Sequence, residues 1–507
     1  MFGNREACRY DVGMPMNTAS PLIQGDLCLL KTDRFAGYIE HFAKVHPEEV
    51  VNAIPDRDAW AWMQGNVPFL ECSDAAIEEI YYYRWWIYRK HIKPTPDGYV
   101  ITEFLPLVGH GGKHNTINCP VGHQLYEGRW IKDTRYVADY ARFMLTGGGE
   151  LHAYSCWFAD GLFRHCCATG DMSLATALLE ELCAYYRKWE GRESGGLFHY
   201  TPWMDGMEFS ISGNQEERFR PTFNAYMYGD SQAIAEIATL AGREDVAAEF
   251  RAKAAALKEQ IQSRLWNQEL EFFASLDMQG RFMPDGAPVR EEVGYVPWYF
   301  HLPDAGYEVA WRQFNDPGGF CSPIGLTSAE IRHPRFLKEN PERLPTWDGP
   351  IWPFATSQTL TALQNVLRDY DQPWVTAADY MRELHKYAAS HTRDGKPDIS
   401  EVIRNPYIAQ MAGSQHYNHS TFCDLVITGA GGLVPRNDET LEISPLFPAG
   451  CDYFCLDGVR YRGRLVTIAW DRTGIRYGKT GLSVYVDKEL RHSSDESDNR
   501  SSVKIAL

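Results

Sequence analysis

Two helices joined by a tight turn are predicted for residues 155–189, which read SCWFADGLFRHCCATGDMSLATALLEELCAYYRKW. Apolar side chains recur at helical spacing over 155–168 and again over 171–189. At the junction, Gly170 is suited to end the first helix and Asp171 to cap the second. Because so short a link holds two helices side by side, the stretch is typical of an antiparallel helical hairpin.

The same alternation of helices and links extends from about residue 30 to residue 431. Another tight link lies at 242–245. Hairpins with short links on one side and long loops on the other can close into a ring, with functional residues on the long-loop face. We therefore predict a mainly α fold, an (α/α)6 toroidal barrel over 31–435. About twelve helices are expected, near 31–45, 74–92, 122–145, 155–168, 171–189, 221–241, 243–265, 294–301, 304–315, 350–370, 373–391 and 417–430. The long connections lie at 93–121, 190–220, 316–349 and 392–416.

The pattern changes after Arg436. Short runs of alternating apolar and polar residues over 440–490 predict strands, with turns at Asp457-Gly458 and near Gly474. We expect a small antiparallel β domain over 436–492 that packs against the barrel. Residues 1–30 are then an N-terminal extension and 493–507 a tail, in which VKIAL is compatible with one more strand.

The composition is that of a folded protein with an acidic surface. Lys and Arg number 50 and Asp and Glu 67, so the net charge is −17. Such a surface repels phosphate backbones and anionic lipids, which argues against nucleic-acid and membrane partners. No apolar run reaches the roughly 18 residues that span a bilayer, and the first residues lack the apolar core of a secretory signal. We expect a cytoplasmic protein.

The cysteine pattern favours neither a metal nor a disulfide scaffold. Twelve cysteines are scattered along the chain without the spacing of a structural zinc site. Buried thiols are therefore expected, with no metal and no cofactor.

Three segments carry candidate carboxylates, and two of them combine these with aromatic residues. Residues 195–210 place Asp205 and Glu208 three positions apart, close to Trp203. A carboxyl group among apolar side chains has a raised pKa, which suits a general acid. Glu401, in a long connection before the last barrel helix, is a candidate general base. Residues 346–353 read TWDGPIWP, in which Gly-Pro predicts a fixed turn and two Trp rings stand at the start of a helix.

These three segments resemble, in the same order, landmarks of the inverting (α/α)6-barrel glycosidases. This six-hairpin superfamily includes processing α-glucosidase, mannosylglycerate hydrolase and trehalase. The stretch 206–210 is similar to the Gly-x-Asp-x-Ser segment of the general acid, with Glu208 in place of Asp. The stretch 347–353 is similar to Trp-Arg-Gly-Pro-x-Trp-Pro, which lines the sugar subsite, with Asp348 in place of Arg. Residues 401–406 and His419-Ser420-Thr421 resemble the general-base loop and its downstream Trp-Ser helix start, without the usual Tyr-Asn step.

The resemblance, which covers roughly residues 70–435, implies an exo-acting glycoside hydrolase with an inverting mechanism and a carbohydrate as its partner. One protonated carboxyl group gives its proton to the leaving oxygen, and an ionised one activates water on the opposite face of the sugar. Glu208, or Asp205 in the next register, would be the acid and Glu401 the base. Residues expected to contact the sugar are Trp203, Trp347 and Trp352 as platforms, and Asp348, Glu103, His114, Asn115, His416, His419 and Trp62.

Two other classes of function fit parts of the same pattern. A sugar epimerase or isomerase on this barrel would use histidines as acid and base, and His110, His114, His416 and His419 lie in suitable loops. A non-catalytic carbohydrate-binding protein would bind sugar with dispensable carboxylates. Substitution of Glu401 by Gln separates a hydrolase from the epimerase, which depends instead on His416 or His419.

Overall fold

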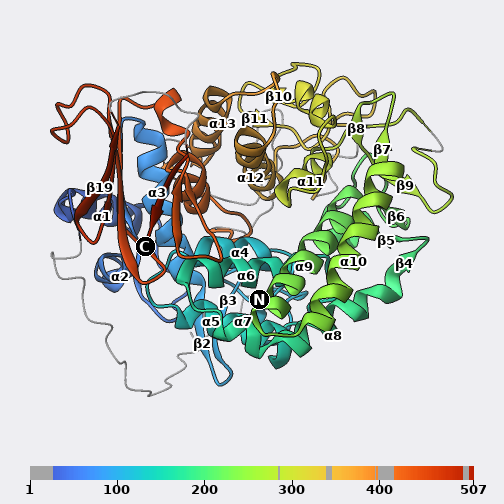
Figure 1. The fold of residues 1–507 in the computed structure, drawn as a ribbon, viewed down its shortest axis with the longest axis horizontal. Coiled ribbons are helices and arrows are strands. Elements are labelled where there is room, and N and C mark those ends of the chain that lie inside the picture. The colour runs from blue at the N-terminus through green and yellow to red at the C-terminus, as the bar shows by residue number, and fades with distance from the viewer. Residues whose placement is uncertain (1–26, 284–285, 339–344, 394–395, 398–415, 495–501) are drawn as a thin grey trace, which may run out of the picture.

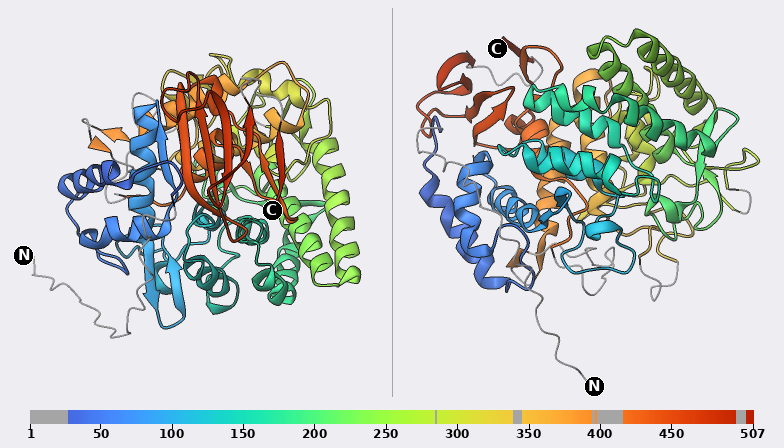
Figure 2. Two further views of the ribbon diagram at one scale, coloured as in Figure 1. Left: turned by 60° about the vertical axis from the view of Figure 1, so that its left-hand side comes forward. Right: turned by 90° about the horizontal axis from the view of Figure 1, so that it is seen from below.

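The computed structural model describes residues 27–283, 286–338, 345–393, 396–397, 416–494 and 502–507. Within these residues, helices form two concentric rings, and a small β domain stands against one side of them (Figure 1). In the left-hand view of Figure 2, the strands of this domain stand side by side in front of the helices. One continuous apolar core extends through both rings and into the β domain.

The inner ring of the described chain contains six helical segments. Each contacts the next around the ring, from α4 through α6, α9, α11 and α12 to η10. The ring closes because the N–H groups of Phe422, Cys423 and Asp424, just before η10, donate to the Glu127 carboxylate in α4 at 2.8 to 3.2 Å. The segments are α4 (Val121–Gly128), α6 (Phe158–Thr169), α9 (Pro221–Leu240), α11 (Val296–Tyr299), α12 (Pro353–Asp369) and the π-helix η10 (Leu425–Ala430).

The outer ring supplies the other helix of each hairpin. Local capping signals explain several of its boundaries: the Asp74 side chain accepts the N–H groups of Ala76 and Ile77 at the start of α3, and Thr376 and Asp379 form a capping box on α13. The outer helices are α3 (Ala75–His91), α5 (Arg135–Arg142), α8 (Leu179–Trp189), α10 (Glu244–Gln260), the 3-10 helix η9 (Glu308–Gln313) and α13 (Ala377–Ser390).

Shorter helices flank the rings or join their members. They are α1 (Ala36–Val45), α2 (Ala59–Asn66), α7 (Ser173–Ala177), the 3-10 helices η1 (Thr32–Phe35), η2 (Asp56–Asp58), η3 (Lys113–Asn115), η5 (Glu190–Arg192), η6 (Pro202–Asp205), η8 (Glu292–Tyr295) and η11 (Phe447–Ala449), and the π-helices η4 (Phe143–Gly147) and η7 (Ile261–Leu265). Of these, α1 and α2 pack on the outside of α3.

The described parts of the long connections enter the inner ring from one side. The stretches before α4, α9, α12 and η10 are the long loops of the sequence, whereas α6 is linked to α7 by three residues and α9 to α10 by three. The N-terminal ends of the inner helices therefore share a face with these loops. This arrangement confirms the predicted mainly α fold of (α/α)6 type with a small C-terminal antiparallel β domain.

Two predicted helices are each divided in the structure. The helix expected over 171–189 is α7 and α8, which meet at Leu178. The helix expected over 122–145 is two helices, α4 and α5, joined by residues 129–134. The chain turns because Arg129 and Trp130 donate through their side chains to Asp424, at 2.8 and 2.6 Å, which a continuous helix would carry away from the last inner segment. Gly128 and Thr134 were the available stop and start signals. The helix expected over 31–45, part of which is α1, lies outside the two rings. Because α4 and α5 are separate helices, the rings still have twelve members among the described residues.

The β domain contains a five-stranded sheet of order β1-β16-β17-β18-β19 and a three-stranded sheet of order β14-β15-β20. Strand β1 comes from near the N-terminus, and Cys72 in it pairs with Phe454. The VKIAL stretch forms β20, which pairs with β15. The strands are β1 (Phe69–Cys72), β14 (Leu433–Val434), β15 (Thr440–Ile443), β16 (Tyr453–Tyr461), β17 (Arg464–Asp471), β18 (Gly481–Val486), β19 (Glu489–Ser494) and β20 (Val503–Ala506).

The predicted turn at Asp457-Gly458 is wrong. These residues lie inside β16, where the register shifts between Leu456 and Val459 as in a β-bulge. The Asp457 carboxylate is used elsewhere, because it accepts the N–H groups of Cys28, Leu29 and Leu30 at 2.7 to 3.1 Å. The chain turns instead at residues 462–463, between β16 and β17.

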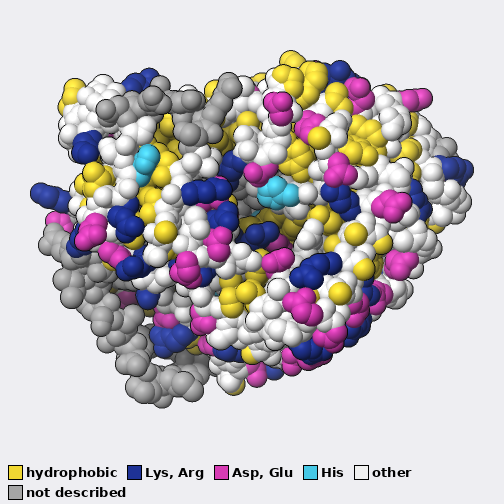
Figure 3. All heavy atoms as spheres, viewed as in Figure 1, with side chains coloured by type: hydrophobic (Ala, Val, Ile, Leu, Met, Phe, Trp, Pro, Cys, Tyr) yellow, Lys and Arg dark blue, Asp and Glu magenta, His cyan; other side chains and the backbone are white. Residues whose placement is uncertain are grey.

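Small hairpins and ribbons line the loops of the barrel. They are β2 (Ile92–Thr95) with β3 (Gly98–Ile101), β7 (Trp266–Asn267) with β8 (Phe272–Phe273), β10 (Cys321–Ser322) with β11 (Gly325–Leu326), β12 (Thr392–Arg393) with β13 (Lys396–Pro397), and a sheet of β4 (Glu193–Ser194), β5 (Leu197–Tyr200), β6 (Arg218–Phe219) and β9 (Leu276–Asp277). On the face shown in Figure 3, acidic and basic side chains are interspersed. No helix among the described residues has the length and apolar character needed to cross a membrane.

Candidate active site

The loop that enters α9 places Glu208 at the edge of the barrel mouth. Thr201 caps η6, and Met207 turns inward until it is buried. The next residue, Glu208, stays half-buried, and Phe209 after it has a φ of 57°, a strained backbone angle for a residue other than glycine. Trp203, 38% exposed, contacts the Phe209 ring edge to face at 6.4 Å. A half-buried carboxyl group thus lies in the same short loop as an exposed indole ring.

Asp205 has quite different surroundings. Its carboxylate, 2% exposed, forms an ion pair with Arg220, whose Nε donates to Oδ2 at 2.7 Å, and it also accepts the hydroxyl of Ser155. Arg220 donates further to Ser212 Oγ at 2.9 Å. Burial raises the pKa of Asp205, while the charge of Arg220 opposes that rise. Since its oxygens are committed to this buried pair, Asp205 holds the loop beneath Glu208.

A second carboxylate, Glu103, lies in the same region as Glu208. Burial raises the pKa of the Cys119 thiol, and the charges of Glu103 and Glu208 raise it further. Burial also raises the pKa of Tyr154, and the charges of Glu208 and Glu103 add to that rise. Glu103 accepts a hydrogen bond from Tyr417 Oη at 2.6 Å. The loops that enter α4, α9 and η10 therefore meet around Cys119 and Tyr154.

The two tryptophans before α12 form a stacked pair. The Trp347 and Trp352 rings lie 4.5 Å apart at 2°, and both are buried. Ser328 holds their turn, because its Oγ donates to the Trp347 carbonyl at 3.0 Å and accepts the Gly349 N–H at 3.1 Å. Gly349 has a φ of 151°, and a side chain there would meet the Phe336 ring at 2.6 Å. Asp348, which follows Trp347 in the sequence, is also buried.

His419 connects the tryptophan pair to Glu103. Its ring stacks on Tyr417 at 3.7 Å and on Phe354 at 6.2 Å, and contacts Trp352 edge to face at 6.4 Å. Tyr417 in turn donates to Glu103. A continuous wall of aromatic and carboxylate groups therefore extends from Trp347 to the neighbourhood of Glu208, on the loop face of the inner ring.

Four other predicted contact residues have partners outside this wall. His114 pairs with Asp97 at the β2–β3 hairpin, with 2.7 Å between Nε2 and Oδ2. The Asn115 side chain holds its own loop by hydrogen bonds to the backbone of Phe104, Pro106 and Val108. Trp62 is buried in α2, and His416 packs against Trp86 of α3 with its Nδ1 3.3 Å from Tyr83 Oη. Glu401 lies outside the described residues.

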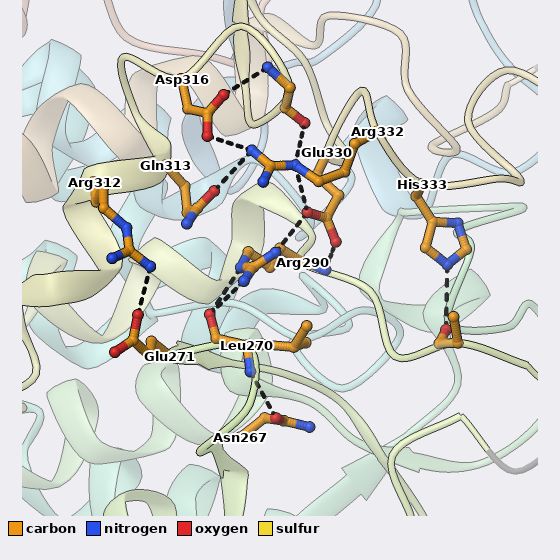
Figure 4. A network of polar contacts seen from close by, with 12 residues as sticks. Asn267, Leu270, Glu271, Arg290, Arg312, Gln313, Asp316, Glu330, Arg332 and His333 are labelled. Atoms are coloured by element: carbon orange, nitrogen blue, oxygen red, sulfur yellow. Dashed lines mark hydrogen bonds and ion pairs between the residues drawn. The ribbon is translucent and has the colours of Figure 1, made fainter.

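A polar network fastens the connection that leads to Trp347. Figure 4 shows Arg290 between the Leu270 carbonyl and the Glu330 carboxylate, with 2.7 Å from Arg290 Nη1 to Glu330 Oε2. Arg332 extends from the same carboxylate to Gln313 and Asp316. Two residues close in sequence to Arg290 and Glu330 hold the loops of the site. Glu291, next to Arg290, accepts the N–H and hydroxyl of Ser212 at 3.0 and 2.7 Å. Ser328, two residues before Glu330, donates a hydrogen bond to the Trp347 carbonyl.

Sequence reasoning missed several members of the wall. His123, Phe354 and Tyr417 occupy it, at the first turn of α4, the start of α12 and the approach to η10. The available signal was position, because the first turns of α4 and α12 and the approach to η10 follow long loops. Fold and site together define a class: an (α/α)6 barrel with carboxylates and stacked aromatic rings on its loop face, an arrangement suited to sugars.

The comparison with known families makes the assignment specific. Residues 113–420 match the mannosylglycerate hydrolase MGH1-like glycoside hydrolase domain, and the chain belongs to this family. Residues 435–490 match the C-terminal domain of glycosyl hydrolase family 65, in agreement with the β domain that the structure has there.

Solved structures resemble this chain. A protein titled "Sialidase" is 38% identical over 95% of this chain, with a TM-score of 0.90, and the chain spans 45% of that protein's length. The GH78 family rhamnosidase of Bacillus sp. GL1 has a TM-score of 0.58 at 14% identity, over 80% of this chain and 40% of that one. The GH63 mannosylglycerate hydrolase of Thermus thermophilus, in complex with glucose, has a TM-score of 0.50 at 14% identity, over 68% and 98%. The last two similarities show a shared fold only.

Proposed function

We propose that the protein is an exo-acting glycoside hydrolase that cleaves a terminal sugar with inversion of configuration. The observation that carries the proposal is the half-buried Glu208 carboxyl group, which lies at the loop face near a second carboxylate and an aromatic wall. Membership in a glycoside hydrolase family supports it.

In this mechanism Glu208 is the general acid. Its protonated carboxyl group gives a proton to the glycosidic oxygen as the bond to the anomeric carbon breaks. Asp205 is a weaker candidate, because its carboxylate is buried and already bound to Arg220 and Ser155. We assign Asp205 the positioning of the Glu208 loop.

The general base in this proposal is Glu401. Its ionised carboxylate takes a proton from water, whose oxygen attacks the anomeric carbon from the face opposite the leaving group, so the product has inverted configuration. The products are the free sugar and the alcohol of the leaving group. Glu103 is the other carboxylate near Glu208, and the experiment below separates the two.

The proposed substrate is a carbohydrate, for which Trp203, Trp347 and Trp352 supply ring faces and Asp348 and His419 polar contacts. Eight of the cysteines in the described part of the chain are buried free thiols, which fits the cytoplasmic location that we propose with the activity. Fractionation of cells that express the untagged protein tests the location.

The epimerase alternative has less support. It needs an acid and a base on opposite faces of one sugar carbon, for which His416 and His419 were candidates. Their rings lie on different sides of their segment, since His416 contacts Trp86 in α3 and His419 contacts Phe354 in α12.

The test compares Glu208→Gln, Glu401→Gln and Glu103→Gln on glycosides with poor and good leaving groups. Glu208→Gln should lose about 10²–10⁴-fold in kcat on alkyl glycosides but retain most activity on dinitrophenyl glycosides, whose leaving group needs no proton. Glu401→Gln should lose activity on both. Proton NMR of the first product should show the inverted anomer.

Two controls sharpen the result. Glu216→Gln changes an exposed carboxylate in the same loop as Glu208 and should leave kcat unchanged. Asp205→Asn leaves Arg220 buried without its partner, so it should lower the free energy of unfolding by about 3–5 kcal/mol. If the Asp205→Asn enzyme is as stable as the wild type and retains activity only on dinitrophenyl glycosides, Asp205 is the general acid. Full activity of Glu401→Gln with loss in Glu103→Gln would transfer the base role to Glu103, and a retained anomer would end the inverting proposal.

A further inference from the structure

Two histidines of the inner ring are buried against the same phenylalanine ring. His123 lies in the first turn of α4 and is 1% exposed, and His419 lies in the segment that enters η10 and is 2% exposed. Both rings contact Phe354 at the start of α12, with ring centres 4.6 and 6.2 Å from it. The two imidazoles therefore flank one aromatic ring on the loop face of the barrel, where α4 and α12 are neighbours of the last inner segment (Figure 1).

Their ring nitrogens have little to bind within the protein. Among the residues that the structure describes, no nitrogen of either imidazole has a hydrogen-bond partner of good geometry, and the His123 ring interacts with the backbone of Phe354. Buried polar groups in proteins are nearly always paired, because leaving them unpaired costs free energy. Two adjacent exceptions at a candidate active site indicate groups kept for a ligand.

The surroundings define what these nitrogens offer. Burial lowers the pKa of His123 to about 3 and that of His419 well below its ordinary value. At neutral pH each ring is therefore uncharged and presents one N–H donor and one lone pair. Trp157 contacts His123 edge to face at 4.8 Å and Tyr417 stacks on His419 at 3.7 Å, so both rings are held in fixed orientations.

We propose that His123 and His419 select an uncharged sugar by binding its hydroxyl groups, an inference that rests on the proposed function and names its substrate class. A hydroxyl group both donates and accepts, so it can pair with either nitrogen of an imidazole. A carboxylate only accepts and leaves the ring lone pairs unpaired. It would also approach Glu103, which is joined to the His419 stack through Tyr417. Acidic sugars such as sialic and uronic acids are therefore disfavoured as the terminal residue.

The experiment measures binding of free sugars to the Glu208→Gln enzyme, which separates recognition from catalysis. D-glucose, D-mannose, D-galactose, L-rhamnose and L-arabinose are titrated against N-acetylneuraminate and D-glucuronate, with tryptophan fluorescence and thermal shift as readouts. His123→Phe and His419→Phe keep a ring of similar shape without nitrogens. The matched control is His165→Phe, which changes another buried histidine with an unpaired Nδ1 in the last turn of α6.

We expect at least one neutral sugar to bind and both acids to fail. His123→Phe and His419→Phe should each raise its Kd at least tenfold while the Tm of the sugar-free protein stays the same or rises, because an unpaired polar group is removed. His165→Phe should leave Kd unchanged. In the catalytically intact background, each site variant should raise KM more than it lowers kcat.

Four results would overturn the inference: no binding by any neutral sugar at 100 mM, tighter binding of the acids, unchanged Kd in both site variants, or a lower Tm with sugar binding retained. The last result would give the two histidines a structural role. Failure of the proposed function looks different, since the wild type would then release no sugar from any glycoside while the two variants still lost binding of the free sugar.

Discussion

The two carboxyl groups of the 205–208 stretch show how three residues of sequence separate two roles. Asp205 is paired with Arg220 and Ser155 in the interior, whereas Glu208 stays half-buried in the same loop as the exposed Trp203. The division follows from the turn: Met207 takes the inward position between them, with its sulfur 3.3 Å from Arg220 Nη2. The same guanidinium that neutralises Asp205 therefore also anchors the residue that directs Glu208 outward.

Glu292 is a buried carboxyl group with a predicted effect on stability. It lies in η8 and is 1% exposed, and burial raises its pKa well above the ordinary value, with a further contribution from Glu383. The unfolded chain loses this proton near pH 4.5, while the folded chain retains it to higher pH. Stability from this group is thus fully present below about pH 4.5 and is lost as pH rises, by at most about 1.4 kcal/mol per pH unit.

Glu292→Gln removes the titration and keeps the shape. The variant should therefore match the wild type near pH 4.5 and become progressively more stable than the wild type toward pH 7.5, as measured by urea unfolding at several pH values. Glu259→Gln, an exposed position on α10, should show no such trend. A difference that stays constant with pH would contradict the raised pKa.

At the residue scale, sequence patterns located the loops of the site better than the side chains within them. Glu103 and Asn115 are polar residues of one connection. Glu103 lies near Glu208, whereas the Asn115 side chain bonds the backbone of its own loop. That difference depends on which way the loop folds, which short-range patterns do not encode. His123 was hidden for another reason, because a single histidine in a helix has the appearance of a packing residue.

At the scale of elements, contact between α4 and α6 depends on a residue without a side chain. A Cβ atom at Gly122 would lie 2.2 Å from Trp157 Cε2, and Trp157 packs on His123 and Tyr226. Gly122→Ala should lower the free energy of unfolding by about 1–3 kcal/mol through overpacking and weaken sugar binding, because the displaced indole moves His123. Chemical denaturation and sugar titration measure the two effects.

Gly65→Ala is the control for this substitution. Gly65 lies in α2 with nothing within 4 Å of an added Cβ, so alanine there should be neutral or stabilising by up to about 1 kcal/mol. Equal effects at the two glycines would mean that backbone propensity, rather than contact with Trp157, determines the result.

Elements with their own end signals were predicted to within a few residues. The helices expected at 74–92 and 221–241 are α3 and α9, which begin after Asp74 and at Pro221. The strand β1 was not predicted, because its four residues carry no turn signal and its partner lies in the last part of the chain. Long-range pairing of this kind leaves no local trace in a sequence.

At the scale of the whole molecule, β1 joins the start of the chain to its end. Glu71 in β1 accepts hydrogen bonds from Arg476 Nε at 2.9 Å and Tyr477 Oη at 2.7 Å, and it pairs with Arg34. These partners lower its pKa against the effect of burial. We infer that the barrel and the β domain unfold as one unit.

Glu71→Ala tests this coupling. Because hydrogen bonds to charged groups are lost, the free energy of unfolding should fall by about 1.5–3 kcal/mol. Hydrogen exchange read by mass spectrometry should show residues 158–169 and 453–471 losing protection together. Glu489→Ala, exposed on β19, should change neither. Loss of protection in 453–471 alone would contradict a single unit.

The pairing of β1 with β16 also has a consequence for biosynthesis. Roughly 380 residues separate Cys72 from Phe454, so at about 5–20 residues per second a ribosome needs on the order of 20–80 s to deliver the partner strand after β1 has emerged. During that interval Phe69 and Leu70, buried in the finished protein, have no sheet to join. The nascent chain must therefore keep an apolar strand shielded until β16 has been synthesised.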